Sequence, residues 1–157
     1  MVNVLYSEVM RGNILTAFLD LLNVKHTKSF TSKHFNEHPH KYNLYGLSEI
    51  LSDYGVENRG FKTGDKEAAI RVLKPPFIAH MGGYFTMVTA IANDKVSSLW
   101  QGKEISVALD TFLQTWSGVG LLAEANEHSI EPDYKENRKK ERIDSLRNFK
   151  NNGKNLF

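Results

Sequence analysis

The spacing of apolar residues changes at Pro75-Pro76, and this change constrains the fold more than any other feature. Before the prolines, apolar residues recur three and four positions apart, which is typical of helices. Beyond them, β-branched and aromatic runs alternate with turn residues, which is typical of strands. We expect helices at 8–23, 43–54 and 66–73, strands at 56–61, 77–80, 84–92, 95–100 and 119–123, and a helix capped by Ser106. This segregation predicts an α+β fold, with a helical N-terminal half packed on an antiparallel sheet from the C-terminal half.

The polar segments of the sequence predict where the loops lie and where the domain ends. Residues 25–42 hold four of the six histidines and Pro39, and we expect loop and short turns there. Residues 131–157 contain eight Lys/Arg and five Asp/Glu, a net charge of +3, and we expect an exposed helix at 135–150. We therefore expect one domain at 1–126 and a charged tail or juxtamembrane linker at 127–157. The rest of the chain is nearly neutral, which argues against a nucleic-acid partner. No apolar run is long enough to cross a bilayer, and no signal peptide is apparent.

The chain has no cysteine, so it has no thiol nucleophile, disulfide or cysteine-bound metal of its own. This composition fits a reducing compartment such as the cytoplasm. The histidines around His38 and His40 are candidate metal ligands. Pro39 between them makes them poor joint ligands, however, and no cysteine is present to complete a site, so we expect no metal and no cofactor. His80 lies in an apolar strand, and Ser117 is adjacent to a glycine, so we interpret both as structural residues.

Four stretches together resemble a known family. They are RGNILTAF at 11–18, LYGL at 44–47 with YGV at 54–56, PFIAH at 76–80 with YFTMV at 84–88, and the segment from Phe112 to Val119 that contains Trp116-Ser117-Gly118. Their order is similar to that of the bacteriocin-processing cysteine peptidase domain of ABC exporters that handle double-glycine leader peptides. The resemblance spans about residues 5–124 and implies a papain-like fold.

The departures from this family concern its catalytic positions. Arg11 stands where the family has its cysteine, and Tyr84 where it has its histidine. The family's Asp-Pro pair falls at Leu99-Trp100, and Leu5 takes the place of the oxyanion-stabilising glutamine. A thiol peptidase needs a thiolate and a base, so the resemblance predicts a catalytically inactive domain.

An inactive domain of this type is expected to bind a peptide or a protein partner. We expect Arg11, Tyr84, Phe85 and Trp100 to make the contacts. The resemblance also implies the cytoplasmic N-terminal part of a larger membrane protein, either an exporter or a vitamin K epoxide reductase/thioredoxin-like fusion, at the inner face of the membrane. Two alternatives stay open: a hydrolase with non-thiol chemistry that uses His80 or the loop at 34–43, and a purely architectural domain.

Overall fold

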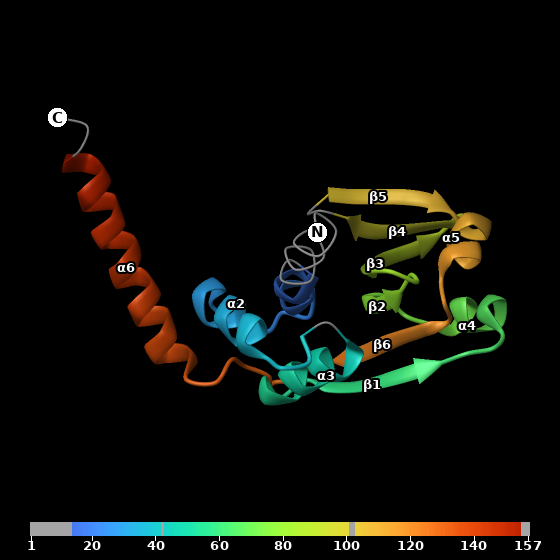
Figure 1. Ribbon diagram of the computed structural model, residues 1–157, viewed down its shortest axis with the longest axis horizontal. Coiled ribbons are helices and arrows are strands. Elements are labelled where there is room, and N and C mark those ends of the chain that lie inside the picture. The colour runs from blue at the N-terminus through green and yellow to red at the C-terminus, as the bar shows by residue number, and fades with distance from the viewer. Residues whose placement is uncertain (1–13, 42, 101–102, 155–157) are drawn as a thin grey trace.

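The computed structural model describes residues 14–41, 43–100 and 103–154. A helical segment at 14–21 comes first. The remaining elements are α2 (Lys28–Glu37), α3 (Leu44–Asp53), β1 (Glu57–Lys62), α4 (Lys66–Val72), β2 (Phe77–His80), β3 (Phe85–Ala92), β4 (Lys95–Trp100), β5 (Lys103–Ala108), α5 (Leu109–Thr115), β6 (Val119–Glu124) and α6 (Tyr134–Lys154). Most of the chain packs around one sheet, and α6 extends away from it (Figure 1).

The six strands form one antiparallel sheet in the order β1-β6-β2-β3-β4-β5. Asn93 and Asp94 make the tight turn between β3 and β4, with φ values of 54° and 59°. Two consecutive residues with positive φ define the hairpin turn whose twist matches the strands. The structure confirms the α+β class and the predicted strands of the C-terminal half.

Each face of the sheet buries a separate core, because neighbouring side chains of a strand point to opposite faces. On one face, Ile78, Met87 and Leu121 pack against the helix at 14–21, α2 and α3. On the other face, Phe77 and Val88 pack against α4 and α5. In Figure 1, the first three helices accordingly lie toward one side of the sheet, and α4 and α5 toward the other. The central strand β2 is therefore covered on both sides.

Two predictions about local structure are wrong. Residues 28–37 form α2 rather than loop, because Thr31 and Phe35, one turn apart, are buried against the core. Helices in proteins are stabilised mostly by the packing of one face, so α2 forms although its polar sequence lacks an apolar periodicity. Ser106 does not cap a helix, because it lies in β5 and pairs with Ser97. The helix α5 begins three residues later, and its N-cap residue is Ala108.

The segment that leads into α6 is attached to the body by a buried carboxylate. Glu131 is 1% exposed and accepts hydrogen bonds from the backbone N–H of Thr27 at 2.8 Å and the hydroxyl of Thr31 at 3.1 Å. The Ile130 N–H also donates to the Tyr54 carbonyl at 2.9 Å. The 21-residue helix α6 follows, and no helix in the described ranges is both long and apolar enough to span a membrane.

Candidate functional site

The turn between β2 and β3 presents Tyr84, the residue predicted from the sequence to stand at the position of the family histidine. The Met81 N–H donates to the Tyr84 carbonyl at 2.8 Å and closes the turn. Gly82, with φ of 89°, supplies a backbone conformation that a residue with a side chain rarely adopts. Tyr84 is 36% exposed.

His80, opposite Phe85 on the neighbouring strand, makes a close pair with Ser117. The His80 Nδ1 lies 2.9 Å from the Ser117 Oγ, and the same hydroxyl donates to the His80 carbonyl at 2.8 Å. A hydroxyl has one proton, so the ring nitrogen donates to Ser117 when that proton points to the carbonyl. The general base of a serine nucleophile must instead accept the hydroxyl proton. This pair is therefore arranged to fix the end of β2 and not to activate Ser117.

The other residues predicted for the site, as contacts or at the family's catalytic positions, have different surroundings. Phe85 is 5% exposed and belongs to the core, with its ring centroid 5.2 Å from that of His80. Leu99 pairs with Met87 across the sheet and packs partly against the same core. Trp100 ends β4, but its side chain lies outside the described part of the structure, as do Arg11 and Leu5. Tyr84 is thus the described candidate with a substantially exposed side chain.

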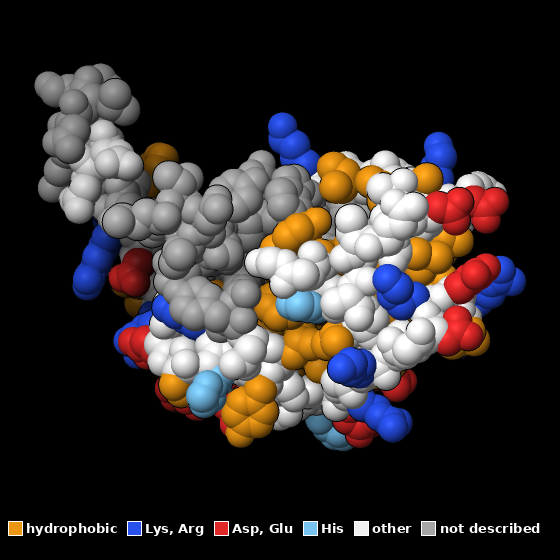
Figure 2. Space-filling view, turned by 45° about the vertical axis from the view of Figure 1, so that its right-hand side comes forward, with side chains coloured by type: hydrophobic (Ala, Val, Ile, Leu, Met, Phe, Trp, Pro, Cys, Tyr) orange, Lys and Arg blue, Asp and Glu red, His pale blue; other side chains and the backbone are white. Residues whose placement is uncertain are grey.

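The face of the molecule in Figure 2 shows a division of side-chain types. Hydrophobic side chains gather near the middle of the view, and the charged ones lie mostly to the right of them and below. An apolar centre with a polar rim is the usual composition of a surface that binds a polypeptide.

Three of the four histidines at 26–40 lie against carboxylates. The Nε2 atom of His34 lies 2.9 Å from Asp53, and that of His38 lies 2.7 Å from Glu49. His26 makes a similar pair with Asp20 at 2.6 Å. No group of three metal-ligating side chains occurs among the residues that the structure describes. His34 and His38 lie four residues apart, and so do their partners Asp53 and Glu49, but in the opposite order along the chain. This spacing in the sequence indicates antiparallel packing of α2 and α3.

Glu49 is also a hydrogen-bond partner of an exposed tyrosine. The Tyr45 hydroxyl, followed by His38, stabilises the charged carboxylate and lowers the pKa of Glu49. The same carboxylate raises the pKa of Tyr45. Tyr45 is 61% exposed and lies on α3, away from the β2–β3 turn in the chain.

Several known structures with this architecture are peptidase domains. The peptidase domain of Streptococcus ComA, a bi-functional ABC transporter involved in quorum sensing, superposes with a TM-score of 0.59 at 15% identity, over 72% of this chain and 88% of that one. A double glycine motif protease from an AMS/PCAT transporter, in complex with the leader peptide, gives 0.65 at 14%, over 74% and 84%. The N-terminal peptidase C39 like domain of a toxin secretion ATP-binding protein from Vibrio parahaemolyticus gives 0.57 at 13%, over 74% and 96%. The fold is therefore of the cysteine-peptidase type.

The peptidase C39 family model matches residues 15–128, and the chain belongs to this family. No curated protein sequence matches it. The match includes Tyr84 and the Leu99-Trp100 pair, and it begins after Arg11. The family normally contains cysteine peptidases, whereas this chain has no cysteine.

Proposed function

We propose that this domain is a catalytically inactive member of the peptidase C39 family that binds a peptide beside the β2–β3 turn. The carrying observation is that the chain keeps the family fold on both faces of its sheet without containing a single cysteine. A thiolate is the nucleophile of this reaction type, and an arginine at residue 11 cannot attack a carbonyl carbon.

The described residues offer no obvious replacement for the thiol. Ser117 is the hydroxyl nearest to a histidine in the site, and its proton is directed to the His80 carbonyl. A hydrolase that uses this pair would have to reorganise both hydrogen bonds before the reaction. This cost makes the hydrolase the less favoured alternative.

Peptide binding is supported by the exposed aromatic residue Tyr84 and by a structurally similar protein that was solved with a peptide. The AMS/PCAT transporter protease was solved with its leader peptide bound, and its fold matches this chain. Tyr84 combines an apolar ring with a hydroxyl and is 36% exposed, which suits it to anchor an extended peptide. We propose further that the domain is the cytoplasmic part of a larger membrane protein, an exporter or a vitamin K epoxide reductase/thioredoxin-like fusion, with residues 127–157 beside the membrane.

The binding proposal is tested by titrating the full chain with a double-glycine leader peptide, followed by calorimetry and amide NMR shifts. We expect shifts around the β2–β3 turn, and we expect Tyr84→Ala to weaken binding by about tenfold or more, because a truncated aromatic anchor costs at least about 1–2 kcal/mol. The matched control is Tyr45→Ala, since Tyr45 is an exposed tyrosine on α3, and it should leave the affinity unchanged. An absence of shifts near Tyr84 would favour an architectural role.

The inactivity proposal is tested by incubating the same peptide with the domain and analysing it by mass spectrometry. We expect the peptide to remain intact. Cleavage that disappears in both Ser117→Ala and His80→Ala would instead establish the non-thiol hydrolase. The Tyr45→Ala variant again serves as the control. Tyr45 lies on α3, outside the His80–Ser117 pair, so this substitution should not change any residual activity.

A further inference from the structure

Three large apolar side chains stand exposed on α6. They are Ile143, Leu146 and Phe149, which are 42%, 62% and 77% exposed. Each follows the previous one at an interval of three residues, so the three lie on one side of the helix and span about 120° of its circumference. They belong to the second half of α6, toward the end that extends away from the sheet (Figure 1). A single exposed apolar residue needs no explanation, whereas an aligned stripe of three marks a surface for contact.

The side of α6 centred on Leu146 also carries positive charge. Four exposed cations fall within about 40° of Leu146 at about 100° per residue, and they are Lys135, Lys139, Arg142 and Lys150. The acidic residues lie farther around the helix, Glu136 at about 80° from Leu146 and Glu141 and Asp144 at about 140–160°. The helix contains eight Lys or Arg and three Asp or Glu, a net charge of +5. Apolar and cationic side chains therefore share one side of α6, which we call the Leu146 side.

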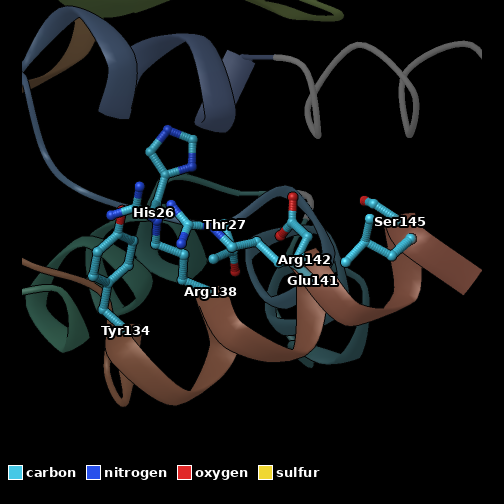
Figure 3. A pocket seen from close by; sticks show the side chains of 8 residues that line it. His26, Thr27, Tyr134, Arg138, Glu141, Arg142 and Ser145 are labelled. Atoms are coloured by element: carbon cyan, nitrogen blue, oxygen red, sulfur yellow. The ribbon is translucent and has the colours of Figure 1, made fainter.

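The body of the domain lies against a neighbouring side of α6. A cavity of about 580 Å³ lies between the helix and the segment that contains His26 and Thr27. Figure 3 shows Tyr134 and Arg138 on α6 with side chains that extend toward this segment, and they fall about 80–120° from Leu146. Leu146 also lines the cavity, yet it is 62% exposed. The Leu146 side thus remains open to a partner while α6 stays attached to the body.

We propose that the Leu146 side of α6 docks on an anionic lipid bilayer, with the helix parallel to the surface. Ile143, Leu146 and Phe149 enter the boundary between headgroups and acyl chains, and the surrounding Lys and Arg side chains bind lipid phosphates. Long cationic side chains can reach the headgroups because their methylene stems cover apolar surface. The inference rests on the proposed position of residues 127–157 beside a membrane, and it names the surface and the class of lipid that hold this segment there.

The combination of charge and apolar side chains favours this occupant over two others. Duplex nucleic acid attracts cations through its phosphates, and those contacts give no role to an apolar stripe. A second copy of α6 would cover the stripe, but it would bring together two helices of net charge +5, and like charges repel. An anionic bilayer suits both features, because negative headgroups border an apolar interior.

The test is flotation of the full chain with phosphatidylcholine vesicles that contain either no phosphatidylserine or about 30% of it. We expect binding to the anionic vesicles only, and loss of this binding as the salt concentration rises from about 0.1 M to about 0.5 M. Lys139→Gln should weaken binding about fivefold, the effect of one cation at a charged surface. The matched control is Lys140→Gln. Lys140 lies about 120° from Leu146 and hence farther from the lipid, so its effect should be less than about twofold.

Because the chain has no cysteine, one introduced cysteine can report which side of α6 enters the lipid. Phe149→Cys and Asn148→Cys each receive an environment-sensitive fluorophore, and position 148 lies about 160° from Leu146. On anionic vesicles we expect a blue shift of the emission at position 149 and none at position 148. Unaltered thermal unfolding curves for all variants exclude a loss of fold.

The inference is overturned if the chain does not float with anionic vesicles, if the two labels shift equally, or if Lys139→Gln and Lys140→Gln weaken binding equally. Without flotation, binding of duplex DNA would assign α6 to nucleic acid, and a dimer in sedimentation would assign it to a second copy. The leader-peptide titration contains no lipid, so its failure and the failure of flotation are separate results.

Discussion

Glu131 connects the body of the domain to α6, and its removal should destabilise the whole fold. Besides the Thr27 N–H and the Thr31 hydroxyl, its carboxylate accepts from the Thr27 hydroxyl at 2.9 Å and from the Asn137 amide at 3.1 Å. It lies at the N-terminus of α2, where the helix dipole favours a negative charge. Thr27 has no side-chain cap bond of its own to α2, so Glu131 is the anionic group that serves this helix end.

The magnitude of the effect follows from the groups that Glu131→Ala leaves without an acceptor. The buried N–H of Thr27 is orphaned, which costs about 1–3 kcal/mol. The Asn137 bond to the carboxylate contributes about 1 kcal/mol more, while the two threonine hydroxyls can rotate and Thr31 keeps its bond to Tyr54. We expect a loss of about 3 kcal/mol in the free energy of unfolding, equivalent to about 6–12 °C in Tm for a domain of this size.

Urea unfolding followed by tryptophan fluorescence measures this loss, because Trp116 is buried. Glu131→Gln keeps one acceptor oxygen but turns an NH2 group toward donors, and it should lose about 1–2 kcal/mol. Glu127→Ala is the matched control, since the Glu127 side chain is 84% exposed, and it should change stability by less than about 0.5 kcal/mol. A loss below about 1 kcal/mol for Glu131→Ala would refute the reasoning, because the carboxylate would then not be needed by its donors.

Two further predictions concern the body of the fold. Gly118→Ala should lower the unfolding free energy by about 2 kcal/mol or more in the same urea assay, because φ is +85° and a Cβ would lie 2.6 Å from the Thr63 carbonyl oxygen. Gly83→Ala, where a Cβ meets nothing within 4 Å, should be nearly neutral, and equal losses at both glycines would contradict this account. Burial raises the pKa of Tyr54 above the value of about 10 that tyrosine has in an unfolded chain. The folded state thus favours the neutral phenol, so stability should be complete below about pH 10 and should fall as the pH rises above it. Tyr54→Phe should cost about 1 kcal/mol near neutral pH, through the lost bond to Thr31, and should make the decline above about pH 10 shallower. An unchanged decline would show that other groups cause it.

Much of the architecture could be predicted from local sequence signals. The Asn93-Asp94 pair with apolar strands on both sides defines a hairpin, and Asn43 caps α3 by accepting from the Gly46 N–H at 3.0 Å. These signals work because the chemistry of one or two residues decides the local backbone. The α+β class followed from them without any knowledge of tertiary contacts.

The elements that were missed depend on distant partners. The helix α2 has few apolar residues, and Phe35 is buried only because the core of the first face lies beneath it. Strand β5 is polar and mostly exposed, and it is defined by its pairing with β4. His26 and Glu141 belong to segments more than a hundred residues apart, and only the folded chain brings them to the same cavity.

The absence of cysteine and the presence of the family fold are compatible, because the residues that stabilise the fold are not cysteines. Both cores are built from apolar side chains of the two sheet faces and the helices that cover them, and residues 15–128 carry the family match without residue 11. Around the β2–β3 turn, His80 and Ser117 satisfy each other and the backbone of β2. Tyr84 is 36% exposed at this turn, so it can contact another molecule, and the titration with Tyr45→Ala as control tests for that contact.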